Sequence, residues 1–285
     1  MRSSVTRATR GIIFRLTLGL LLGLLLLAPQ AWGQALPTDW QGANLRAIAI
    51  PNPADFSFAV FGDNRDDAGR FDTLISSVSR DPTIAFSINL GDLVNHADPG
   101  LYSYFFGQVR NLVKPLLTVI GNHELSPAPY GRELYADIFG PSVGPFYYSF
   151  QFGHYYFVVL DDGGDTGPDP TQQAWLVAEL QKAQGYKYRL VFLHIPLYDP
   201  SGAGTHCLPK ADADKLLATF KKYKVTQVFA GHVHGYFHGS WGGIPYLISG
   251  GAGVPLSGSN PSHYFFHYLK VHATNRGFDV TIKKF

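Results

Sequence analysis

The amino-acid sequence predicts an α/β protein with a mostly parallel β-sheet covered by helices. Short apolar runs alternate with segments whose apolar residues recur at helical spacing, from Phe56 as far as Phe139. Several of the apolar runs end in a glycine that is followed at once by polar side chains. No linker or change of composition interrupts the chain after residue 54, so we expect residues 55–285 to form a single domain.

The first half of this domain predicts the order β-α-β-α-β, followed by a further helix. Residues 68–80 carry apolar side chains at helical spacing, and Asp81-Pro82 ends that helix. The remaining helix of the repeat, and the helix after it, show the same spacing, and Gly140-Pro141 ends the latter. The expected strands are residues 56–61, 84–90 and 115–120, and the other expected helices are residues 101–113 and 130–139.

The second half predicts an aromatic antiparallel hairpin and then further α/β elements. Gly153 separates the two aromatic runs of the hairpin, residues 146–152 and 154–160. Thr171 is expected to cap a helix that continues to Ala183. The elements expected after it are a strand at 188–193, a helix at 210–223, a strand at 225–230 and antiparallel strands from residue 244 onward.

Residues 1–35 have the layout of a secretory signal peptide. Four arginines accompany an apolar stretch from Leu16 to Ala28, and Pro29 and small residues follow it. The stretch is short for a permanent membrane span, and cleavage after Gly33 or Ala35 fits the small-residue pattern. We therefore expect an exported protein, periplasmic or extracellular, without a stable membrane anchor after cleavage. An uncleaved amphipathic anchor is the alternative, and residues 36–54 are expected to be a loose lead-in.

Charge and cysteine content exclude some classes of protein. The whole chain has a net charge of +2, and the only charges before Asp39 are the four arginines of the predicted signal, so the rest carries −2. The mature part therefore offers no basic groove for nucleic acid, which argues against a secreted nuclease. Cys207 is the only cysteine, so no intrachain disulfide forms and stability must come from core packing. The oligomeric state has no signature in the sequence.

Polar side chains that suit a metal centre follow the predicted strands. Because ligands in open α/β sheets bind beyond the carboxyl ends of the strands, these loops can converge on one site. Carboxylate, amide and imidazole ligands together favour ions such as Mn, Fe or Zn over calcium. Two such ions bridged by a carboxylate activate a water and clamp a phosphoryl group, which predicts a phosphoester hydrolase. The candidate residues are Asp63, Asp92, Asn122 with His123, His194, His232 and His234.

These motifs, in this order, resemble those of the calcineurin-like metallophosphoesterases. That broad family includes purple acid phosphatases and cyclic-nucleotide phosphodiesterases, and the similarity spans about residues 56–255. The resemblance implies a four-layer α-β-β-α sandwich of two mixed sheets flanked by helices. The matching stretches are Asp63, Gly91-Asp92, Gly121-Asn122-His123-Glu124, His194 and Gly231-His232-Val233-His234.

The resemblance also implies a role for each matched residue. It places His123 outside the metal ligands, where it protonates the leaving oxygen or stabilises charge in the transition state. It implies that a hydroxide between two metal ions attacks the phosphorus of a small phosphoester in line. The implied ligands are Asp92 as the bridge, Asp63 and His234 for the first ion, and Asn122, His194 and His232 for the second.

Arg65 departs from the family pattern, which has a metal-binding histidine at this position. A guanidinium has no lone pair to give to a metal. Asn95 also stands where purple acid phosphatases have a tyrosine, which argues against the purple variant. Either the first ion is bound weakly, with Asn95 or water completing its shell, or Arg65 contacts the substrate phosphate with its bidentate fork. We expect both, and count Arg65 with His123 as catalytic.

Plainer interpretations exist for the same residues. A lone aspartate after a strand, such as Asp63 or Asp92, is often a turn or helix-cap residue, and His194 alone would be read as a packed strand-end histidine. Their combination favours metal ligation. A catalytically weak member that binds metal or a phosphate ligand is the alternative function. His206, His96 and Tyr198 are candidates for the pocket lining, and Gly250–Gly253 fits either a close approach of backbone to the site or an ordinary turn.

Overall fold

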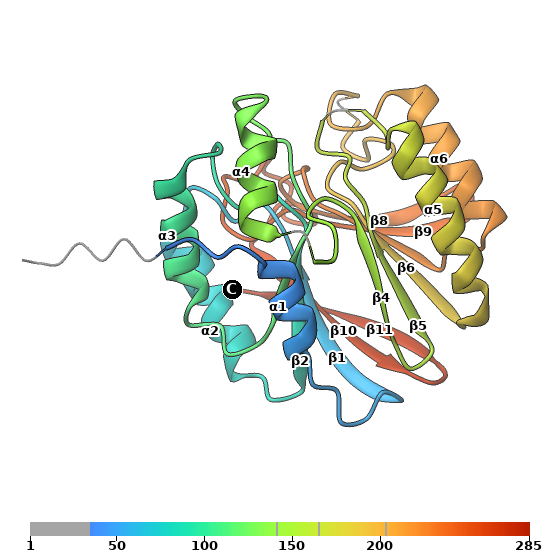
Figure 1. Cartoon of the computed structure of the whole chain (residues 1–285), viewed down its shortest axis with the longest axis horizontal. Coiled ribbons are helices and arrows are strands. Elements are labelled where there is room, and N and C mark those ends of the chain that lie inside the picture. The colour runs from blue at the N-terminus through green and yellow to red at the C-terminus, as the bar shows by residue number, and fades with distance from the viewer. Residues whose placement is uncertain (1–34, 141, 165, 203) are drawn as a thin grey trace, which may run out of the picture. The chain divides into compact units, whose positions relative to one another are not determined.

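Two β-sheets pack face to face in the computed structural model (Figure 1), which describes residues 35–140, 142–164, 166–202 and 204–285. The first sheet has the strand order β11-β10-β1-β2-β3 and the second β4-β5-β6-β7-β9-β8. The strands of the first sheet are β1 (Asp55–Phe61), β2 (Ile84–Asn89), β3 (Leu116–Thr118), β10 (His267–Thr274) and β11 (Gly277–Lys284). Those of the second are β4 (Tyr148–Phe152), β5 (Tyr155–Val159), β6 (Tyr188–Phe192), β7 (Gln227–Ala230), β8 (Tyr236–Trp241) and β9 (Ile244–Ser249).

Helices cover the outer faces of both sheets, so the predicted four-layer α-β-β-α arrangement is confirmed (Figure 1). Apolar residues of α2, α3 and α4 pack with β1 and β2 in one core cluster, and those of α5 and α6 pack with β5, β6 and β7 in another. The helices are α1 (Trp40–Ala47), α2 (Ala68–Arg80), α3 (Pro99–Val109), α4 (Tyr130–Phe139), α5 (Pro170–Lys182) and α6 (Lys210–Lys222). A short 3-10 turn, Ala183–Gly185, follows α5.

A layer of aromatic side chains fills the space between the sheets. Phe58 on β1 and Phe86 on β2 stack at 5.2 Å between ring centroids, and Phe58 meets Phe157 of the other sheet edge-on at 5.5 Å. Successive residues of β1 alternate between the two sides, as strand geometry requires. Phe58 and Val60 face the inter-sheet layer, and Ala59 and Phe61 face the helices.

Both sheets are mixed, with a parallel centre. β1, β2 and β3 run parallel, as do β5, β6, β7 and β9, while β10 pairs antiparallel with β1 and β11 pairs antiparallel with β10. The sequence predicted antiparallel strands in the tail but not that they return to the first sheet. The parallel strands therefore send their carboxyl ends to shared edges, where the polar loops begin.

The sequence pattern placed α2 and α4 at the residues that the structure shows, because both have strong stop signals. The expected cap at Thr171 is wrong. Asp169 caps α5 through a side-chain bond to the Gln172 N–H, and Pro170 occupies the first helical position, where its missing N–H costs nothing.

Residues 36–54 are not all loose, since they contain α1. This helix is held by contacts far away in the chain rather than by its own pattern. Trp40 donates its indole N–H to the Leu116 carbonyl at 2.8 Å. The buried Gln41 amide donates to the carbonyl oxygen of Thr118 at 2.8 Å and accepts from its N–H at 3.2 Å. The strand β8 was also not predicted.

The predicted signal peptide lies outside the described residues apart from Ala35. Within the described part of the chain, no helix has the length and apolar character that crossing a membrane requires.

Candidate metal centre

The loops that follow β1, β2, β3, β6 and β7 bring the six predicted ligands together. The amide oxygen of Asn122 lies 3.0 Å from His194 Nε2 and 3.0 Å from His232 Nδ1. His194 Nε2 also lies 3.3 Å from Asp92 Oδ1. His194 Nδ1 donates to the Leu90 carbonyl at 2.8 Å, so its Nε2 carries the lone pair. Oxygen and nitrogen atoms from four side chains therefore lie around one point.

A second group of donors lies beside the first. Asp63 Oδ2 accepts the His232 backbone N–H at 3.0 Å, whereas its Oδ1 is buried and has no hydrogen-bond partner among the described residues. His234 Nε2 lies 3.7 Å from that oxygen, and its Nδ1 is 3.0 Å from the Pro255 carbonyl. One ligand atom each from Asp63, Asp92 and His194 lies within 4.8 Å of the others. An orphaned buried carboxylate oxygen beside an imidazole lone pair fits a bound cation.

Burial sets the charge state of these groups. It depresses the pKa of His232 to about 3 and that of His234 to about 4, and it lowers the pKa of His194. The imidazoles are therefore neutral at pH 7, as ligands must be. Burial, together with the charge of Asp92, raises the pKa of Asp63. Burial opposes ionisation of Asp92, but basic neighbours, led by His194, hold its pKa below the ordinary value.

The backbone is strained at three of the candidate ligands. Asp63, Asp92 and His232 have φ angles of 61°, 57° and 65°, in the left-handed region that non-glycine residues seldom occupy. Glycines let the loops close around the carboxylates. A Cβ on Gly231 would lie 2.8 Å from Asp63 Oδ2, and one on Gly250 would lie 2.9 Å from the same atom. The close approach expected as one interpretation of Gly250–Gly253 is thus confirmed at Gly250.

Arg65 lies against Asp92 rather than in solvent. Its Nε is 3.3 Å from Asp92 Oδ2, and its Nη1 donates to Asp66 Oδ2 at 2.8 Å and to Asn95 Oδ1 at 3.1 Å. Asn95 and Asp66 also hydrogen-bond to each other. Only 12% of the Arg65 side chain is exposed. A fixed positive charge therefore faces the side of Asp92 that is turned away from His194.

His123 is oriented toward the same carboxylate. Its Nδ1 donates to the Asn95 carbonyl at 2.7 Å, which leaves Nε2 with the lone pair, 3.7 Å from Asp92 Oδ2. The His123 backbone N–H donates to Asp92 Oδ1 at 3.2 Å. The side chain is 31% exposed, so a substrate can reach it.

Two carboxylates for which the sequence analysis gave no role hold the loops in place. Glu124, the last residue of the matched motif, is fully buried and accepts four backbone N–H groups. These belong to Gly121 and to residues 92–94, so Glu124 ties the Asp92 loop to the Asn122 loop. Asp162 accepts the backbone N–H groups of His194 at 2.8 Å and Ile195 at 3.1 Å. Asp162 follows the predicted apolar strand at residues 154–160, and this position is the sequence feature that could have identified it.

Two of the predicted pocket-lining residues, His206 and Tyr198, differ in what they contact. The ring of His206 lies 5.5 Å from that of His232, so the loop after β6 reaches the centre. Tyr198 instead donates its hydroxyl to Asp214 at 2.6 Å and meets the ring of Trp241 edge-on.

Buried carboxylates, an amide and neutral imidazoles at the edge of two stacked sheets define a metal-dependent hydrolase of the α/β class. The sequence model for calcineurin-like phosphoesterases matches residues 56–236. The chain belongs to the calcineurin-like phosphoesterase family, whose members are phosphoric ester hydrolases that use divalent metal ions.

Two relatives agree with this assignment. The chain is 30% identical over 195 residues to the rat serine/threonine-protein phosphatase CPPED1, with 61% of each chain covered. It is 28% identical over 201 residues to a probable cyclic nucleotide phosphodiesterase of Rhodopseudomonas palustris, covering 65% of this chain and 70% of that protein. The chain thus spans about three fifths of the rat relative.

Two solved structures share the fold. The yellow lupin purple acid phosphatase PPD1 superposes with a TM-score of 0.61 at 19% identity, covering 81% of this chain and 51% of that one. A dimetal phosphatase from Danio rerio also gives 0.61, at 15% identity, covering 82% and 97%.

Proposed function

We propose that the protein is an exported enzyme that hydrolyses a phosphomonoester or phosphodiester by direct transfer of the phosphoryl group to water. The observation that carries the proposal is the convergence of oxygen and nitrogen atoms from Asp92, Asn122, His194 and His232, with the Asp63 oxygen that has no hydrogen-bond partner beside them. Burying carboxylates and imidazoles side by side costs free energy, because the groups lose their contacts with water. A bound cation would offset that cost.

The donor set fits two ions of the Mn, Fe or Zn type. Asp92 would serve both, since its Oδ1 faces His194 and its Oδ2 faces away from it. Bound ions would lower the pKa of a water and offset charge on the phosphoryl oxygens. Asp63 and His234 would hold the first ion, and Asn122, His194 and His232 the second.

His123 acts on the leaving group. The Asn95 carbonyl fixes its Nδ1–H and so aims Nε2 at the space in front of Asp92. When Nε2 is protonated, it can donate to the departing oxygen, and such assistance contributes about 10²–10⁴ in rate.

Arg65 both binds phosphate and weakens the first metal position. Its contacts to Asp92, Asp66 and Asn95 use Nε and Nη1, which leaves Nη2 to donate to a phosphate oxygen. Its charge also competes with a cation for Asp92 Oδ2. The first ion is therefore held less tightly than the second.

Hydrolysis of an aryl phosphate and of the matching bis-aryl diester, with and without chelator, tests the proposal. We expect activity that chelator abolishes and added metal restores. Asp92→Asn should lose it, while Asp137→Asn, an exposed carboxylate on α4, should keep it. Metal-loaded protein that hydrolyses neither ester would contradict an enzymatic role and favour a metal- or phosphate-binding member, in which the Arg65–Asp92 pair replaces part of the metal charge.

The N-terminal sequence supports the export part of the proposal. Sequencing the amino terminus of the protein recovered outside the cytoplasm should find a start at Gln34 or Leu36, after cleavage at Gly33 or Ala35. An intact Met1 on all of the protein would contradict cleavage.

A further inference from the structure

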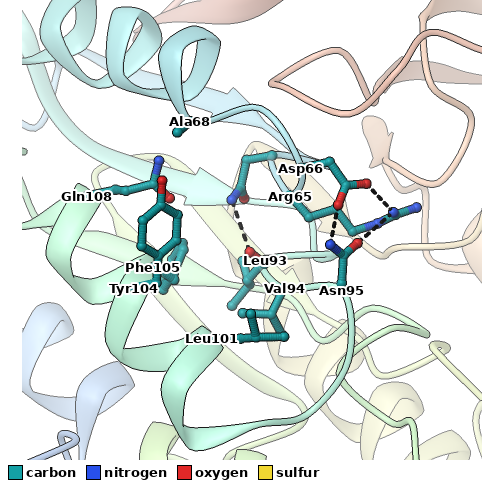
Figure 2. A pocket seen from close by; sticks show the side chains of 11 residues that line it. Arg65, Asp66, Ala68, Leu93, Val94, Asn95, Leu101, Tyr104, Phe105 and Gln108 are labelled. Atoms are coloured by element: carbon teal, nitrogen blue, oxygen red, sulfur yellow. Dashed lines mark hydrogen bonds and ion pairs between the residues drawn. The ribbon is translucent and has the colours of Figure 1, made fainter.

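A pocket of about 170 Å³ lies beside the metal centre, between α3 and the loops after β1 and β2 (Figure 2). An apolar protein cavity of about 150 Å³ accommodates one benzene molecule. The pocket therefore has room for a six-membered ring. Its apolar wall comes from Ala68, Leu93, Val94, Leu101, Tyr104 and Phe105.

The amide and charged side chains that line this pocket each form bonds within the protein. Asn64 donates to the Leu93 carbonyl and accepts from Asn89, and Gln108 donates to Asp72. Arg65, Asp66 and Asn95 bond to one another, as Figure 2 shows. A sugar would need partners for several hydroxyl groups, and breaking these bonds to supply them is costly. An aromatic ring needs no such partners, and Tyr104, 58% exposed, offers it a stacking face.

The pocket adjoins the part of the centre where the leaving group departs. Arg65 lines the pocket and reaches Asp92 with its Nε. Asn95 lines it too, and its backbone carbonyl holds the Nδ1 of His123. Arg65 and Asn95 are therefore shared between the pocket and the groups around Asp92 and His123.

We propose that this pocket binds the aromatic ring of the leaving alcohol, so that the substrates are aryl phosphoesters. The inference rests on the proposed function, because it takes the centre to be the phosphoryl site. The phosphate lies at the centre against Arg65, and the ring lies in the pocket against Leu101 and Tyr104.

Ala68→Leu tests the inference by filling the pocket. Ala68 stands at the first position of α2 and lines the pocket, and leucine is a good helix former, so the fold should tolerate it. The matched control is Ala174→Leu, an exposed helix position on α5. Binding of benzylphosphonate and methylphosphonate to metal-loaded protein is measured by calorimetry, which does not depend on turnover.

We expect the wild type to bind benzylphosphonate roughly tenfold or more tightly than methylphosphonate, as burial of one ring predicts. Ala68→Leu should remove most of that preference without changing the affinity for methylphosphonate, and Ala174→Leu should change neither. Tyr104→Ala should reduce the preference in the same direction.

Equal affinity of the wild type for both ligands, or an Ala68→Leu effect of equal size on both, would overturn the ring pocket. Failure of every phosphoester to be hydrolysed would instead contradict the proposed enzyme. The two failures are distinguishable, because the phosphonates report binding alone.

Discussion

Glu124→Gln is the substitution whose effect can be worked out most directly from the structure. One carboxylate oxygen accepts from Leu93 and Val94 at 2.8 and 3.2 Å, and the other from Asp92 and Gly121 at 2.9 and 2.8 Å. A glutamine has one oxygen and one NH₂ group, so it loses two of these four bonds however the amide is turned. Each buried N–H group that is left without an acceptor costs about 1–3 kcal/mol, so we expect a loss of about 2–6 kcal/mol in the free energy of unfolding.

Urea unfolding of the metal-free protein measures this loss without a contribution from bound ions. The control is Glu133→Gln, an exposed carboxylate on α4, which should change the unfolding free energy by no more than about 0.5 kcal/mol. Metal affinity should also fall by roughly 10- to 100-fold, because Glu124 orients the Asp92 and Asn122 loops.

The pKa of Glu124 bears on this test. Burial and the charge of Asp92 raise it to about 8, against the effect of the backbone N–H donors, so the carboxyl is protonated at pH 7. Both of its oxygens can still accept N–H groups in that state, whereas glutamine has a single acceptor oxygen. A variant as stable as the wild type would refute the view that Glu124 braces the two loops.

Three further substitutions test other parts of the structure. Arg65→His supplies the missing imidazole and removes the competing charge, so metal counting should show firmer occupancy of the first position than in the wild type; unchanged occupancy would contradict the proposed competition. His123→Asn removes the proton donor and should lower kcat by roughly 10²–10⁴ with the metal content unchanged, and a smaller effect would assign the proton to another group. The pKa of the buried His267 is depressed to about 4, chiefly by burial, whereas the unfolded chain titrates near 6.5. The unfolded state therefore binds the proton first as pH falls, and the wild type should lose about 2 kcal/mol more stability than His267→Gln between pH 7 and pH 5; parallel pH profiles would count against this.

The repeated pattern of apolar strand, glycine and polar side chain was enough to predict the α/β class and the six side chains that meet. Each of those residues lies within a few positions of a strand end, so local order along the chain carries the information. The limits of α2 and α4 were predictable for the same reason, since their stop signals are local.

The features that were missed depend on contacts across the chain. Helix α1 is held by bonds from Trp40 and Gln41 to β3, more than 70 residues away. The bracing role of Glu124 consists of bonds to the backbone of another loop, which no residue pattern reveals. The sequence showed that Arg65 departs from the family pattern, but its partners Asp66 and Asn95 could be identified only from the folded structure.

The six predicted ligand residues are divided between two sheets. Asp63, Asp92 and Asn122 follow strands of the first sheet, and the three histidines follow strands of the second. The separation of these two halves is set by the phenylalanine layer, with Phe58 of one sheet against Phe157 of the other. The distance between the two halves of the candidate site therefore depends on the size of these buried rings, and a substitution in the phenylalanine layer should shift the predicted ligands relative to one another.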